Sequence, residues 1–122
     1  MAKKVYTRTF THQTTTSGVA NGVWTIAMPS NALWSVAMVC IANDTTGGNE
    51  RAQYRRHMLA YRKAGGAATI QGATETVGTD VETNATLDAT LGVSGNDIGS
   101  SVTGLAATTL DWVFCITIVE AP

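Results

Sequence analysis

Hydrophobic and polar residues alternate along much of this 122-residue chain, with the two-residue period of a half-buried β-strand. Residues 3–11, 87–93 and 98–102 follow this pattern, and residues that favour turns separate such segments. Strands and turns of this kind predict an all-β protein. We expect an antiparallel β-sandwich, jelly-roll-like, with about eight strands.

Two segments, residues 33–42 and 110–119, are apolar on both faces rather than on one. This pattern is typical of central strands that are covered on both sides, and we expect that position for both segments. Each contains one cysteine, Cys40 or Cys115. With synthesis in the cytoplasm, we expect both thiols to be reduced and buried. The alternative is a disulfide between them, which requires the two strands to be neighbours.

Residues 50–63 fit two patterns. Tyr54, Met58 and Tyr61 recur at helical spacing, and Asn49 stands where a helix N-cap would be. As a strand, the segment places Tyr54 and Met58 on one face and mostly polar residues on the other. We favour the strand, because every neighbouring segment is predicted to be β and tertiary context overrides local propensity.

The length allows one domain. We divide the chain into residues 1–18, an N-terminal arm or an edge strand, and residues 19–122, the β-sandwich domain. Threonines at 14–16 are expected to form a flexible joint between them. An arm would bring basic and apolar side chains to a neighbouring protein. The residues expected to make this contact with a neighbouring protein are Lys3, Lys4, Val5, Tyr6, Arg8 and Phe10.

Charged residues make up only 14% of the chain, and 20 Thr, 17 Ala and 12 Gly take their place. This composition suggests a surface that another protein partly covers. All eight basic residues precede position 64 with only two acids, whereas seven acids and no basic residue follow. The resulting +6 and −7 segments either neutralise each other within one fold or join one copy to the next. A net charge of −1 argues against direct binding to nucleic acid.

The search for reactive groups finds no catalytic, cofactor or metal site. His12 and His57 are the only histidines, and no Cys/His spacing fits zinc. Motifs for nucleophilic catalysis or phosphate binding do not occur, so we expect no enzyme activity and no cofactor. The acidic residues Glu75, Asp80 and Glu82 are interpreted as a solvated loop.

The three tryptophans, Trp24, Trp34 and Trp112, stand in strand settings that favour core or subunit packing. The N-terminus has the pattern of neither a secretion signal nor a membrane span. We therefore expect synthesis in the host cytoplasm and no membrane partner.

One set of motifs resembles a known module. An arginine-bearing segment runs into Gly65-Gly66, a Ser94-Gly95-Asn96 hairpin follows, and a Val102-Thr103-Gly104 turn precedes a strand with Trp112. In this order and spacing, residues 33–122 resemble the β-sandwich module of tailed-bacteriophage virion proteins. Head-decoration, head-fibre and tail-fibre proteins contain this module and commonly assemble as trimers.

The resemblance implies a structural virion protein. We expect a capsid decoration or cement protein that binds the major capsid protein and stabilises the head shell as a homotrimer on the capsid surface. The alternative is a tail-fibre or head-fibre tip that binds a glycan receptor on the host. The resemblance does not cover residues 1–32, so it leaves the mode of attachment open.

Overall fold

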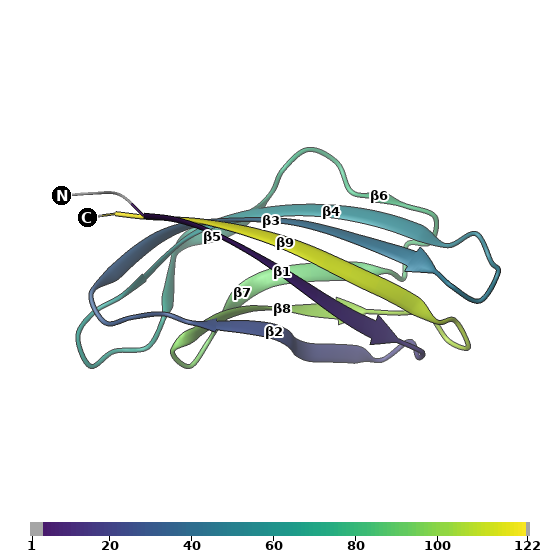
Figure 1. Ribbon diagram of the computed structural model, residues 1–122, viewed down its shortest axis with the longest axis horizontal. Coiled ribbons are helices and arrows are strands. Elements are labelled where there is room, and N and C mark those ends of the chain that lie inside the picture. The colour runs from purple at the N-terminus through teal and green to yellow at the C-terminus, as the bar shows by residue number, and fades with distance from the viewer. Residues whose placement is uncertain (1–3, 122) are drawn as a thin grey trace.

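The computed structural model describes residues 4–121, which form two antiparallel β-sheets packed face to face (Figure 1). The large sheet has the order β1-β9-β3-β4-β5, with the short β6 beside β4, and the small sheet has the order β2-β8-β7. The predicted antiparallel β-sandwich is confirmed. The strands are β1 (Lys4–Thr14), β2 (Val19–Ala27), β3 (Ala32–Asp44), β4 (Arg51–Arg62), β5 (Thr69–Thr76), β6 (Val81–Glu82), β7 (Asp88–Ser94), β8 (Asp97–Thr103) and β9 (Leu110–Glu120).

The segment that fitted both a helix and a strand is β4. It pairs with β3 in unbroken antiparallel register from Ala32 opposite Arg62 to Asn43 opposite Arg51. The alternation that places Tyr54 and Met58 on one face is therefore the pattern that the fold uses, and the strand interpretation is confirmed.

The N-terminal segment is built into the large sheet. β1 pairs with β9 along its whole length, from Lys4 opposite Glu120 to Thr14 opposite Leu110. The Trp112 indole nitrogen donates a hydrogen bond of 2.9 Å to the Thr14 hydroxyl, and both side chains are buried. Thr14 thus belongs to the core rather than to a flexible joint.

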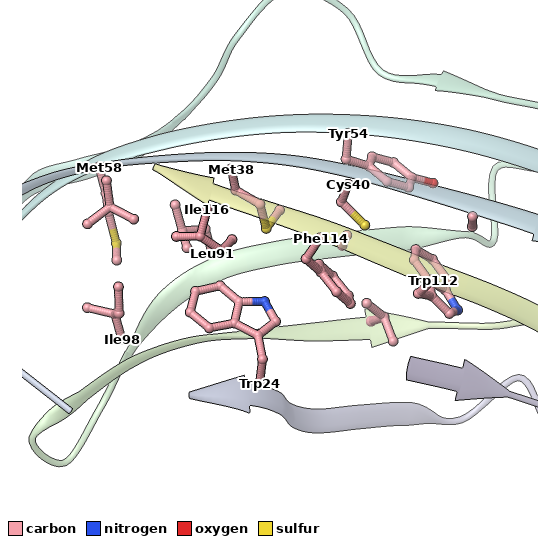
Figure 2. Close-up of a cluster of buried hydrophobic side chains, with 14 of the residues drawn as sticks. Trp24, Met38, Cys40, Tyr54, Met58, Leu91, Ile98, Trp112, Phe114 and Ile116 are labelled. Carbon is pink, nitrogen blue, oxygen red and sulfur yellow. The ribbon is translucent and has the colours of Figure 1, made fainter. Parts of the chain in front are cut away.

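The core lies between the two sheets and is lined by every second residue of each long strand (Figure 2). Trp24 reaches up from β2 toward the large sheet, where Phe10 stacks on it with ring centroids 5.2 Å apart. Trp112 stacks on both Tyr54 and Phe114. All three tryptophans are buried, in agreement with the expected core packing.

The prediction that residues 33–42 and 110–119 are covered on both sides is wrong. β3 and β9 are central in their sheet, but the small sheet covers only their inner face. Cys40 points inward and is fully buried, whereas Cys115 points outward and is exposed, which corrects its expected burial. Because the two thiols face opposite sides of the sheet, they are not paired.

The acidic residues interpreted as a solvated loop hold this part of the chain to β4. Asp80 forms an ion pair with the buried Arg56 guanidinium, at 2.6 Å, and Glu82 accepts a hydrogen bond of 2.5 Å from the Tyr54 hydroxyl. The Asp80 hydrogen bond raises the pKa of Arg56 further. Burial, followed by the Glu82 contact, raises the pKa of Tyr54. Glu75 is exposed, as the pattern suggested, but it lies in strand β5 rather than in a loop.

Candidate functional site

The outward side of the large sheet carries exposed apolar side chains among polar ones, and we call this side the outer face. It is built by the odd-numbered residues of β1, β9, β3 and β4, together with Val81 of β6, which pairs with Gln53. Val5, Leu33, Val39, Ile41, Leu59, Val81, Val113 and Val119 lie on it, and they are eight of the ten large hydrophobic residues exposed in the described part of the chain.

The strand register places these side chains in two groups, which the row of Thr7, Thr117, Ala37 and His57 separates. One row across the sheet runs Thr9, Cys115, Val39, and the next row runs Thr11, Val113, Ile41. Val39 and Ile41 are 43% and 48% exposed, although both lie on a central strand. Four strands about 4.8 Å apart and about 35 Å long make a face of roughly 700 Å².

Charge is distributed unevenly at one end of the outer face. A single row runs Gln13, Asp111, Asn43, Arg51 across β1, β9, β3 and β4. The Gln13 amide donates a hydrogen bond of 2.8 Å to the Asp111 carboxylate. Arg51 and Arg55 are both exposed on β4. The β9 side of this row is therefore acidic and the β4 side is basic.

A serine and a histidine meet on the outer face. The Ser35 hydroxyl lies 3.1 Å from the His57 Nε2 atom, and Glu75 is the register partner of His57 on β5. In the register Ser35 pairs with Leu59 and His57 with Ala37, so the two residues are diagonal neighbours. Because β3 is paired on both sides, its backbone N–H groups are engaged in the sheet rather than free to stabilise an oxyanion. The contact instead provides two polar side chains with a hydrogen bond on a largely apolar surface.

Two further concavities differ in character from the outer face. A hollow of about 530 Å³ on the small sheet is lined by hydroxyl, amide and glycine residues, among them Asn21, Thr90 and Ser101, with the register partners Gly92 and Gly99. A smaller cavity of about 170 Å³ between β1 and β2 is lined by Tyr6, Arg8, Ile26, Ala27, Trp34 and Ile118.

The six residues expected to make capsid or subunit contacts are divided by the alternation of β1. Val5 points to the outer face, whereas Tyr6 and Phe10 pack beside Trp34 and Trp24 inside the sandwich. Lys4 and Arg8 are exposed, and the Arg8 guanidinium lies 5.7 Å from the centre of the Tyr6 ring. Lys3 lies outside the described residues.

Sequence reasoning did not single out the outer face as a site. Its signal was present in the double-sided apolar pattern of residues 33–42 and 110–119. Within residues 4–121, no group of three or more His, Cys, Asp or Glu residues is placed to hold a metal ion. The same residues include no helix long and apolar enough to cross a membrane.

Comparison with known proteins gives one structural neighbour to report. The chain is similar in fold to the tailspike protein of Acinetobacter baumannii phage AM24, with a TM-score of 0.55 and 13% sequence identity. The match covers 93% of this chain but only 26% of the tailspike, so this chain spans about a quarter of its length. No protein-family model and no curated protein sequence matches. At this identity the likeness concerns the fold alone.

Proposed function

We propose that this chain is a structural protein of a bacteriophage particle, a capsid decoration protein that binds the head shell as a homotrimer. The observation that carries the proposal is the outer face, which spans roughly 700 Å² by strand spacing and carries eight exposed Val, Leu and Ile side chains among polar ones. A surface of this size is suited to burial against other proteins, for which stable contacts use about 800 Å² per partner. The role is therefore mechanical, adding buried area over joints of the shell.

Two independent likenesses support a place in a phage particle. The turn motifs of residues 54–112 resemble those of virion β-sandwich modules. The fold as a whole is similar to part of a phage tailspike. A decoration role also fits a candidate site that is an exposed sheet face rather than a cluster of reactive side chains.

The capsid contact in this proposal uses the basic residues that β1 leaves exposed, Lys4 and Arg8, with Lys3 before them. Tyr6 and Phe10 contribute by fixing β1 in the sandwich, since both pack against tryptophans there. Exposed basic side chains direct a protein to an acidic partner and set its association rate.

A second candidate is supported by the tailspike likeness. As a fibre or tailspike module, the chain would bind a host-surface glycan, and the hydroxyl-lined hollow on the small sheet is the place for it. Hydroxyl and amide groups hydrogen-bond sugars, although no aromatic side chain lines this hollow.

Immunogold electron microscopy of the phage that encodes this chain separates the two candidates. Label on the heads supports decoration, label on the tail supports the second candidate, and unlabelled particles overturn both. Head binding by purified protein then tests the contact. Arg8→Glu should lower head occupancy, whereas Lys63→Glu, the same charge change in the turn after β4, should not. Equal occupancy for both variants would contradict the proposed contact.

A further inference from the structure

We infer that the outer face binds two further copies of this chain, so that three large sheets surround a threefold axis with their outer faces turned inward. This inference deepens the proposed homotrimer by naming its interface, and it rests on that stoichiometry but not on a place in the virion. The occupant of the face is therefore another copy of the same surface.

Burial of apolar area is the first reason. The outer face holds eight exposed Val, Leu and Ile side chains. Its central strand β3 carries Val39 and Ile41, and the charged Arg51, Arg55 and Asp111 lie on the neighbouring strands. Protein interfaces have such a centre, depleted of charge and enclosed by a polar rim. The roughly 700 Å² of the face is close to the standard 800 Å² or so that each partner contributes to a stable complex.

The charge arrangement is the second reason, and it favours a head-to-tail ring. Rotation about an axis parallel to the strands keeps each residue at its own level, so the row with Asp111 and Arg51 meets the same row of the next copy. In a ring, the β4–β5 edge of one copy approaches the β1–β9 edge of its neighbour, because β1 and β5 are the outermost strands. Arg51 then faces Asp111 of the next copy, which opposes charges of unlike sign.

The thiol of Cys115 can report whether the outer face is covered. Cys115 is exposed in the middle of the face, between Thr9 and Val39, whereas Cys40 is buried between the sheets in every copy. Assembly through the outer face should therefore protect Cys115 from alkylation. Cys40 should react only when the sandwich unfolds.

Ile41→Lys, compared with Val19→Lys, tests the interface directly. Ile41 lies on the central strand β3 of the outer face and is 48% exposed, whereas Val19 is a β-branched residue on the small sheet and is 62% exposed. By analytical ultracentrifugation we expect a wild-type trimer, and Ile41→Lys should weaken self-association at least about 30-fold, as loss of a central interface residue does. Val19→Lys should remain trimeric.

Several results would overturn the inference. A wild-type monomer or dimer contradicts the threefold arrangement, and a stable Ile41→Lys trimer contradicts the interface. Circular dichroism should show both variants folded. If Ile41→Lys does not fold, alkylation of wild-type Cys115 decides, since it should be slow in concentrated protein and fast after dilution. Equal rates at all concentrations contradict burial of the face.

Charge reversal tests the orientation of the ring. Arg51→Asp should weaken trimer formation by about tenfold, and adding Asp111→Arg should restore it, because the pair is reversed rather than removed. Lys63→Asp, outside the face, is the matched control. Failure of the double variant to recover would exclude this pairing. Trimer dissociation tests this interface, whereas virion labelling tests the proposed location. Failure of one proposal can therefore be distinguished from failure of the other.

Discussion

The two faces of β3 are both largely apolar, but they lie in opposite environments. On β3, the inward Val36 and Met38 are no more than 1% exposed, while the outward Val39 and Ile41 exceed 40%. The small sheet covers the inner face, and no part of residues 4–121 covers the outer one. One strand thus contributes both to the core and to a surface suited to another protein.

Apolar residues on the two faces of the sheet are removed from water by two different events, folding and association. Inner side chains stabilise the fold of a single copy, because folding alone removes them from water. Outer side chains gain the same stabilisation only when a second molecule arrives. Substitutions on the two faces should therefore change different equilibria, unfolding in one case and association in the other.

Removal of β1 should have the largest effect, because this strand contributes to both faces at once. Deletion of residues 1–14 takes away the whole β1–β9 ladder and the Thr14 partner of Trp112. Domains are stable by only about 5–15 kcal/mol, so we expect the truncated chain not to fold. Circular dichroism and urea unfolding measure this. A stable truncated sandwich would show that β1 is a dispensable arm.

Neighbouring residues of β9 make the sharpest comparison of the two faces. Phe114→Ala should lower the free energy of unfolding by about 3–5 kcal/mol, since it removes a fully buried ring. Val113→Ala, on the outer face, should change the stability of the monomer by no more than about 0.5 kcal/mol. Urea unfolding at low protein concentration provides both values. Similar losses for the two variants would contradict the difference between the faces.

Alkaline pH should lower the stability of the fold through a buried thiol on the inner face of the large sheet. Burial raises the pKa of the Cys40 thiol to about 12, above its ordinary value of 9.0. The folded state therefore holds this proton more tightly, so its contribution is complete below pH 9 and is lost as pH rises toward 12. Stability should fall by up to about 1.4 kcal/mol per pH unit from this group.

The variant Cys40→Ala should flatten that decline, and Tyr54, whose pKa is also raised, accounts for a further part of it. Cys115→Ala serves as the matched control on the outer face. Urea unfolding between pH 8 and 11 measures the slopes. An identical slope for wild type and Cys40→Ala would exclude the thiol as the cause.

The smallest expected effect is a gain in association alone. Thr117 lies on the outer face between Thr7 and Ala37 in the register. Thr117→Val replaces a hydroxyl with a methyl group of similar size, which should strengthen self-association by a few-fold. The unfolding free energy of the monomer should change by less than about 0.5 kcal/mol. Sedimentation equilibrium measures the association constant. Weaker association of Thr117→Val than of the wild type would contradict this prediction.

Strand positions could be predicted from the sequence because alternation is a local property. It located the two apolar strands and, with tertiary context, identified residues 50–63 as a strand. The pairing of β1 with β9 could not be derived, since it joins residues at opposite ends of the chain. Nothing in a local pattern specifies which of several compatible strands becomes the neighbour.

The outer face was detected but misinterpreted. The apolar pattern of β3 and β9 indicates which positions avoid water, and it does not say whether the cover belongs to the same chain. Arg56 shows the same limit. It shares the buried face of β4 with Tyr54 and Met58, but only the fold shows that Asp80 is close enough to pair with it.

The pairing of β1 with β9 also has a consequence for protein engineering. Lys4 lies opposite Glu120, so both ends of the described chain emerge side by side, while the β3–β4 loop lies at the far end of the sandwich (Figure 1). Adjacent strands are about 4.8 Å apart, which a linker of a few residues spans. We therefore expect the sandwich to tolerate insertion into a surface loop of another protein, because its two ends lie close together. For the same reason we expect it to tolerate circular permutation with new termini in the β3–β4 loop.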